Sequence, residues 1–385
     1  MSWREVVPLG QTLIERETVT KLFDSVQIGR YTLDNRVTMA PLTRQRAGED
    51  GTPTDLHKEY YSQRASAGLV VTEGVFPAYS CRSFPGQAGL ATDEHTEAWK
   101  PVAEAVHARD GVIFAQVMHG GRTSHPDLLR DAPVKAPSAL ATGGEVRGFG
   151  GKTEGVVPEA LTTEEIAQVI EEFRLSARRA IDAGLDGIEV HGANGYLLHE
   201  FMAPNSNVRE DEYGGSPANR ARLTAEIIRA VAEEIGADRT AVRISPQHNI
   251  QGIAEVDVDE TIETYQALFD QIADLKLAYV SVLVNDPQSP VATELRQQIQ
   301  HTHGWPLLLN TGFAVVTQLD EAQKIVDELG ADAAVVGRML IANPDLVERW
   351  KSGAELNEPD MATFYAGGPK GYIDYPSLEK AHVNS

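Results

Sequence analysis

The stretch that decides the fold runs Asp186-Gly-Ile-Glu-Val-His-Gly-Ala-Asn-Gly-Tyr-Leu-Leu-His-Glu200. Its apolar run, residues 187–190, ends in a polar cluster, which predicts a buried strand that meets a loop. His191 and Asn194 can both donate hydrogen bonds to one acceptor, and Tyr196 carries a phenolic proton. Two donors on one carbonyl oxygen, with an acid nearby, suit a reaction of a polarised substrate. Because Asn-Gly is also a turn signal, the motif alone leaves open that these side chains only cap a loop.

Composition restricts the class of protein. The chain has 385 residues, 42% apolar and 23% charged, which is ordinary for a globular protein with a sizeable core. It carries 34 basic and 56 acidic side chains, a net charge of −22, which disfavours nucleic acid and anionic membranes as partners. Cys81, the single cysteine, excludes an intramolecular disulfide and a cysteine zinc cluster. The N-terminus lacks a targeting pattern, so we expect a cytoplasmic protein with no membrane association.

Strand-like and helix-like stretches alternate along the chain. A hairpin is expected at residues 26–33 with its turn at Gly29. The expected strands cover residues 37–40, 69–74, 112–116, 187–190, 241–245, 279–284, 306–310 and 333–337. The expected helices cover residues 56–67, 94–108, a stretch from the capping box at 162–165, a stretch from 216–217, then 260–272, 291–299, 315–329, and a last one that opens at Asn343-Pro344.

This alternation predicts an α/β fold, a (β/α)8 TIM barrel. The strands are apolar on both faces, as buried parallel strands are. We expect an N-terminal extension at residues 1–22, one barrel domain at 23–378 and a C-terminal tail at 379–385. A long loop insertion after strand 3, residues 119–159, is rich in Gly, Pro and Ser and is a candidate lid.

In such barrels the chemistry lies at the carboxyl ends of the strands. The side chains expected there are Thr43, Gly74, Gln116, His119, His191, Asn194, Arg243, Asn285, Asn310, Gly312, Gly337 and Arg338. Small residues and an arginine after strands 7 and 8 are typical of a phosphate site, although Arg338 could instead form a surface salt bridge. Arg243, inside an apolar strand, must either pair with Glu189 or face a bound anion. Thr43 could belong to a loop turn, and Gln116 could make a bond inside the barrel.

Several classes of site are disfavoured. No lysine stands at a strand end, which argues against a Schiff-base aldolase. There is no G-x-G-x-x-G and no Walker sequence. His301 and His303 precede strand 7, at the opposite face from the expected site, and His199-Glu200 lacks the second histidine of a zincin. No metal site is therefore predicted.

The chain resembles the Old Yellow Enzyme family of FMN-dependent ene reductases over about residues 21–378. The matching motifs are Ala40-Pro-Leu-Thr43-Arg44, Thr72-Glu-Gly74, Gln116, Glu189-Val-His191-Gly-Ala-Asn194-Gly-Tyr196-Leu-Leu, Glu212-Tyr-Gly-Gly-Ser216, Asn219-Arg-Ala-Arg, Arg243-Ile-Ser-Pro246, Gly337-Arg338, Asn343-Pro-Asp-Leu and Gly371-Tyr-Ile-Asp-Tyr-Pro376. Thr43, where another branch has cysteine, points to the branch that resembles the plant and yeast enzymes.

The resemblance implies a noncovalent FMN at the barrel mouth and NADPH, or NADH, as the reductant in the same pocket. Cofactor contacts would come from Pro41, Thr43, Gly74, Gln116, Arg243, Gly312, Phe313, Gly337 and Arg338. Thr43 would bond the carbonyl edge of the flavin, Gly74 and Gln116 its pyrimidine side, and Arg243 would face N1. His191 and Asn194 would bind the oxygen of an activated alkene (an enone, maleimide or nitro compound), and Tyr196 would protonate Cα. Tyr365 and Met118 would line the substrate pocket, with Met118 where several members carry tryptophan.

Three alternatives remain beside this interpretation. The first is a flavin-free barrel lyase or isomerase that uses His191 and Tyr196 as acid and base. The second is a flavin-binding sensor without turnover. The third, an iron–sulfur relative of the family, is disfavoured because one cysteine cannot ligate a cluster. The expected partners are small molecules, activated alkenes and phenolic ligands, and the chain would be a monomer or a homodimer.

Overall fold

The computed structural model describes residues 20–312, 316–365 and 367–378. Its centre is a closed barrel of eight parallel strands, which confirms the predicted TIM barrel. In order around the barrel the strands are β3 (Val37–Met39), β4 (Leu69–Val75), β5 (Ile113–Val117), β10 (Gly187–Gly192), β11 (Thr240–Ile244), β12 (Tyr279–Leu283), β13 (Leu307–Asn310) and β14 (Ala333–Val336). Every residue of β3, β4, β5 and β10 is buried, as the apolar character of both strand faces predicts.

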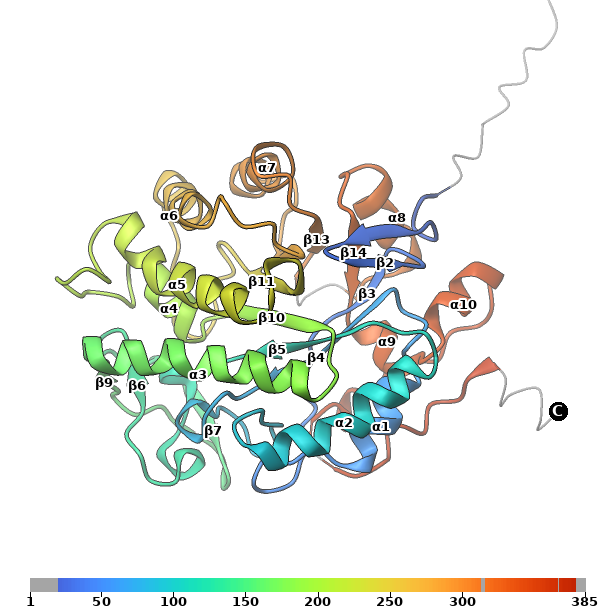
Figure 1. The fold of residues 1–385 in the computed structure, drawn as a ribbon, viewed down its shortest axis with the longest axis horizontal. Helices are drawn as coiled ribbons and strands as arrows, with labels where there is room; N and C mark the ends of the chain where they lie inside the picture. Colours follow the sequence, from blue (N-terminus) through green and yellow to red (C-terminus); the bar gives the residue numbers. More distant parts are fainter. Residues whose placement is uncertain (1–19, 313–315, 366, 379–385) are drawn as a thin grey trace, which may run out of the picture.

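Helices surround the strands (Figure 1). They are α1 (Asp55–Ser62), α2 (Asp93–His107), α3 (Thr163–Asp182), α4 (Leu197–Met202), α5 (Pro217–Ile235), α6 (Val258–Gln271), α7 (Pro290–Gln297), α8 (Leu319–Asp327), α9 (Arg338–Ala342) and α10 (Leu346–Ser352). The predicted capping box opens α3: the Thr162 hydroxyl accepts from the Glu165 N–H at 3.2 Å, and the Glu165 carboxylate accepts from the Thr162 N–H at 2.9 Å. No helix in the described ranges combines the length and hydropathy that crossing a membrane requires.

The N-terminal hairpin closes the amino end of the barrel. It consists of β1 (Val26–Ile28) and β2 (Tyr31–Leu33), with a positive φ of 55° at Gly29 as predicted. Ile28 and Leu33 pack into the interior core together with Phe114 from β5. The predicted extension lies outside the described residues up to position 19, and the tail from 379 to 385 lies outside them entirely.

The insertion after β5 has more regular structure than a loop. It contains the short helices η2 (Gly121–Thr123) and η3 (Pro126–Leu129), and β6 (Lys135–Ala136), which pairs with β9 (Glu159–Ala160). It also contains an antiparallel hairpin of β7 (Glu145–Gly148) and β8 (Gly151–Glu154). In Figure 1 the labelled strands β6, β7 and β9 lie together at one end of the molecule. The hairpin brings a part of the insertion to the barrel mouth.

The prediction that the last helix opens at Asn343-Pro344 is wrong. A short helix, α9, directly follows β14, and its last turn is closed by Asn343, whose side chain donates to the Met339 carbonyl at 3.0 Å and accepts from the Asn357 N–H at 2.7 Å. Helix α10 begins two residues after Pro344. Helix α8 begins at Leu319, later than the predicted residue 315, which lies outside the described residues.

Candidate active site

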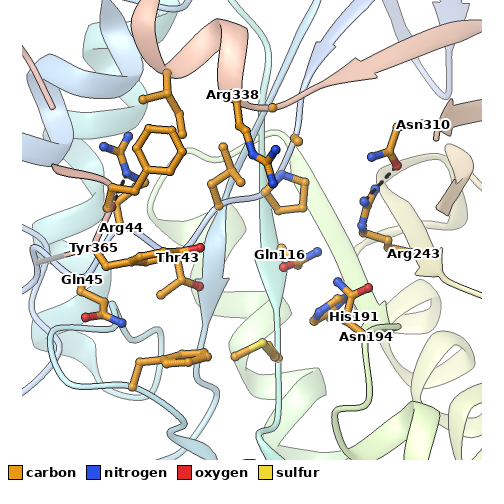
Figure 2. Close-up of a pocket in the computed structure, with 18 of the residues that line it drawn as sticks. Thr43, Arg44, Gln45, Gln116, His191, Asn194, Arg243, Asn310, Arg338 and Tyr365 are labelled. Carbon is orange, nitrogen blue, oxygen red and sulfur yellow. Dashed lines mark hydrogen bonds between the residues drawn. The ribbon is translucent and has the colours of Figure 1, made fainter. Parts of the chain in front are cut away.

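A cavity of about 270 Å³ lies at the carboxyl ends of the barrel strands. Most of the residues that the sequence singles out line it (Figure 2), namely Pro41, Thr43, Gln116, Met118, His191, Asn194, Tyr196, Arg243, Gly312, Gly337, Arg338 and Tyr365. Gly74 is not among the lining residues, and Phe313 lies outside the described residues. The convergence follows from the barrel, because parallel strands bring their carboxyl ends to one rim.

Arg243 supplies a buried positive charge at this rim. Its guanidinium donates to the Ser281 hydroxyl at 2.7 Å and to the Asn310 side-chain oxygen at 3.1 Å, both neutral acceptors. Burial lowers the pKa of Arg243, and the charge of Glu189 opposes that effect. The Glu189 carboxylate accepts a hydrogen bond from the Gln116 amide, at 2.8 Å. Both proposed environments of Gln116 are therefore present, because it bonds inside the barrel and also lines the cavity.

His191 and Asn194 present polar atoms to the cavity from the end of β10. The pKa of His191 lies well below its ordinary value, mainly because of burial and also because of the nearby charge of Arg243. His191 is therefore a neutral imidazole at neutral pH. Among the described residues, the buried His191 Nδ1 and Asn194 Oδ1 have no hydrogen-bond partner. Such orphan groups are costly unless a ligand or water meets them.

The turn that carries Asn194 has an unusual backbone. Asn194 adopts a positive φ of 59° and Gly195 one of 76°. The Asn194 N–H donates to the Ser245 hydroxyl at 2.7 Å, and its carbonyl accepts from the Gln251 amide at 2.6 Å. A non-glycine residue held in the left-handed region by its neighbours is a feature that clusters at functional sites.

Tyr196 follows this turn as the residue before α4. Its ring centroid lies 5.1 Å from that of His191 and 6.4 Å from that of Phe84. Burial raises the pKa of Tyr196 to about 12, against a lowering effect of the Gln251 side chain. The phenol thus keeps its proton throughout the neutral range and can donate it.

A second group of lining residues is suited to an anion. Gly312 has a φ of 93°, and a Cβ at this position would lie 2.6 Å from the Asn285 side-chain oxygen. Gly337 precedes Arg338, and both line the cavity. In Figure 2 Arg338 enters the cavity from above, and Arg243 lies to the right. Two arginines, with two glycines that add no side chain of their own, are the residue types that can hold a phosphate or a similar anion.

Two arginines that line the cavity, Arg44 and Arg147, were given no role by sequence reasoning. Arg44 donates to the carbonyls of Phe364 and Gly371, at 2.7 and 2.8 Å, and so holds the C-terminal segment against the cavity. Its place in the motif Ala40–Arg44 was the available signal. Arg147 reaches the cavity from β7, with its guanidinium 5.4 Å from the Tyr365 ring centroid. Because it belongs to the aperiodic insertion, no signal in the sequence pointed to it.

Comparisons with known proteins agree with this geometry. The model of the NADH:flavin oxidoreductase / NADH oxidase family matches residues 21–357. A probable flavin mononucleotide-dependent alkene reductase of Leishmania infantum is 38% identical over 368 residues, which cover 94% of this chain and 99% of that protein. The solved structure of the Old Yellow Enzyme homologue from Zymomonas mobilis superimposes with a TM-score of 0.87 at 36% identity, over 93% of this chain and 100% of that one. Morphinone reductase in complex with tetrahydroNAD gives a TM-score of 0.85 at 38% identity, over 94% and 98%.

Proposed function

The chain belongs to the NADH:flavin oxidoreductase / NADH oxidase family, that of the Old Yellow Enzymes, and from this premise we propose an FMN-dependent ene reductase in which Tyr196 is the proton donor. Membership makes the protein an oxidoreductase that uses FMN and a nicotinamide reductant. The flavin-free lyase or isomerase alternative is therefore set aside. The cytoplasmic location, the preference for NADPH and the monomeric or dimeric state stay predictions.

The residues at the barrel mouth fit FMN, which combines a flat tricyclic ring with an anionic phosphate. Arg338 and the glycines at 312 and 337 would hold the phosphate, since all three line the cavity and the glycines add no side chain of their own. Arg243 would face the ring, since the acceptors at hydrogen-bond distance of its buried cation are neutral among the residues that the structure describes. Gln116 and Thr43 offer uncharged polar groups to a heterocycle edge, and Pro41 an apolar contact. The roles of Gly74 and Phe313 stay predictions.

His191 and Asn194 would bind the oxygen of an electron-poor alkene. Both can donate a hydrogen bond to this oxygen as neutral groups, since burial keeps His191 neutral. When bound, FMN supplies the hydride chemistry, taking a hydride from NAD(P)H and passing it to Cβ of the alkene. Tyr196 would then give its phenolic proton to Cα. Tyr365, Met118 and Phe84 would form the walls that decide which alkenes or phenols enter.

One observation carries this proposal. Arg243 and Arg338 line the same cavity as three hydrogen-bond donors, His191, Asn194 and Tyr196. The outermost of these five residues, His191 and Arg338, are 147 positions apart in the sequence. A flavin that uses the two arginines would hold its reactive face near the three donors. No other described cavity contains any of these side chains.

The test is an absorption spectrum of the pure protein before and after anaerobic NADPH, followed by turnover with 2-cyclohexenone. We expect a yellow protein whose flavin absorbance is lost on addition of NADPH and returns on addition of 2-cyclohexenone. Tyr196→Phe should leave bleaching intact and slow the alkene step by ~10²–10⁴-fold, the usual contribution of a general acid. A colourless protein that FMN does not turn into an NADPH oxidant would refute the reductase, and reduction without turnover beyond oxygen would indicate a flavin-binding sensor. An unchanged alkene step in Tyr196→Phe would remove Tyr196 from its role.

A further inference from the structure

The turn that presents Asn194 and Tyr196 is held from behind by a buried histidine. The Gly195 N–H donates to His199 Nδ1 at 3.1 Å, one turn further along the chain in α4. The neighbouring loop lies close to Gly195, since a Cβ on this residue would be 2.8 Å from the Gln251 Cβ. The contact with His199 therefore fixes the peptide between the two functional side chains.

This contact dictates the protonation of His199. Because Nδ1 accepts a hydrogen bond, it carries no proton, and a neutral imidazole must then carry its proton on Nε2. Nε2 lies 3.3 Å from Glu255 Oε1, an ion-pair distance without the alignment of a hydrogen bond, and both side chains are almost completely buried. The pair thus joins α4 to the loop between β11 and α6.

Glu255 is surrounded by donors. Its Oε2 accepts from the Gln247 N–H at 2.6 Å, and its Oε1 accepts from the Tyr265 hydroxyl at 3.2 Å as well as facing His199. A carboxylate is the side chain that offers acceptors on both of its oxygen atoms. Glu255 is therefore suited to meet an N–H, and not a bare nitrogen, on the imidazole.

We propose that Glu255 is a positioning residue that selects the Nε2–H tautomer of His199 and thereby leaves Nδ1 to hold the Asn194–Tyr196 turn. Neither Glu255 nor His199 lines the cavity, so both act through the turn and not on the substrate. The inference rests on the proposed function, because its catalytic consequence passes through Tyr196. A merely structural pair would stabilise the fold without depending on which nitrogen carries the proton.

The substitution Glu255→Gln separates these two roles. The tight Gln247 N–H contact requires an oxygen, so the amide NH₂ must take the place of Oε1 and face His199. His199 Nε2 then accepts a hydrogen bond from this NH₂, and the proton of the imidazole moves to Nδ1. Two N–H groups, those of Nδ1 and Gly195, then face each other and the hydrogen bond between them is lost. Glu260→Gln is the matched control, since Glu260 pairs with Arg220 near the same loop and does not face His199.

The first measurement is ¹⁵N–¹H correlation NMR of the imidazole rings in the FMN-loaded protein, with the His199 signals assigned by their loss in His199→Asn. We expect the Nε2–H tautomer in the wild type and in Glu260→Gln, and the Nδ1–H tautomer in Glu255→Gln. A cationic or Nδ1–H ring in the wild type, or an unchanged ring in Glu255→Gln, would overturn the proposal. The wild-type spectrum can overturn the proposal even if a variant does not fold.

The second measurement follows reoxidation of the reduced enzyme in stopped flow. Glu255→Gln and His199→Ala should slow reoxidation by 2-cyclohexenone by roughly 10-fold or more, since misplacement by 1 Å can cost on the order of 10²-fold. His199→Asn should recover most of the rate, because its side-chain oxygen can accept from Gly195. Reoxidation by ferricyanide, which needs no proton from Tyr196, should not change. If Tyr196→Phe slows the cyclohexenone step and Glu255→Gln does not, the positioning role is wrong; if Tyr196→Phe itself has no effect, the proposed function loses its proton donor.

Discussion

Glu200 offers a quantitative test of how the insertion is fastened to the barrel. The side chain is fully buried on α4, and its Oε1 accepts from the Arg122 N–H at 2.9 Å in the insertion. Its Oε2 is buried without a hydrogen-bond partner among the described residues. Burial raises the pKa of Glu200 to about 8, against smaller lowering effects of the Arg122 charge and N–H. We predict that Glu200→Gln makes the protein more resistant to unfolding at alkaline pH.

The magnitude follows from linkage between proton binding and folding. A carboxyl whose pKa is higher in the folded state contributes stability below the unfolded value of 4.5, and this contribution is lost as the pH rises to about 8. Each pH unit in that window lowers the free energy of unfolding by about 1.4 kcal/mol, so the loss at full ionisation of Glu200 is roughly 5 kcal/mol. Between pH 6 and pH 9 the free energy of unfolding of Glu200→Gln should therefore gain about 2–3 kcal/mol relative to the wild type. An amide group without an acceptor offsets ~1–3 kcal/mol of this, equally at every pH.

The assay is urea denaturation at pH 6, 7, 8 and 9, with the difference between variant and wild type plotted against pH. All other ionisable groups are common to both proteins and cancel in this difference. Glu97→Gln, on an exposed position of α2, is the control, and its difference should stay flat. A flat difference for Glu200→Gln as well would refute the reasoning, since it would mean that Glu200 ionises alike in the folded and unfolded chains.

Three further outcomes are expected. Gly312→Ala should weaken FMN binding, measured by fluorescence titration of the apoprotein, because its φ is 93° and the new Cβ would lie 2.6 Å from the Asn285 oxygen. Arg243→Met should weaken the same binding by ~10–100-fold, the loss of a hydrogen bond to a charged group, and an unchanged affinity would place the cation away from the cofactor. Gly371→Ala should lower the melting temperature, because φ is 64° and the Cβ would lie 1.8 Å from the Thr363 hydroxyl, whereas Gly330→Ala, with nothing within 4 Å, should cost less.

The barrel and most of the site could be predicted because both depend on strand ends. A buried parallel strand appears in the sequence as an apolar run, and the residue after it must lie at the common rim. This is why His191, Arg243 and Arg338 could be placed together without any pairwise signal between them. Helix boundaries were predicted where the capping contact is local, as at Thr162 before α3. They were missed where a residue distant in sequence makes the contact, as Asn357 does at the end of α9.

Gly74 shows what strand counting cannot provide. The pairing of β4 with β5 shifts register between Val71 and Gly74, so residues after the shift do not follow the alternation expected from the strand start. Gly74 consequently lies behind Met118 and Gln116, where a Cβ would be 3.0 Å from the Met118 sulfur. Glycine fits at position 74 because these side chains approach its backbone closely, and the sequence does not reveal that approach.

The contacts of His199 could not be predicted from the sequence either. In the sequence His199 stands beside Glu200, and the pair invited comparison with a metal-binding helix motif. In the structure its acidic partner is Glu255, 56 positions later, and Glu200 faces the insertion instead. Neighbours in a helix point in different directions, so a contact in this protein is decided by which loop packs on which helix face.

An acidic chain that binds an anionic cofactor is consistent once distances are considered. At physiological ionic strength the charges of exposed carboxylates are screened over roughly 8 Å, so the net charge of −22 acts mainly on how often an anion reaches the mouth. Arg243 and Arg338 line the cavity and would act on a bound anion at contact distance, where water is displaced and screening is weaker. Retention of the cofactor should therefore depend on these two side chains and on the glycine backbone beside them, and hardly on the many surface carboxylates. The same separation explains why overall charge can argue against nucleic acid as a partner without arguing against a phosphate site.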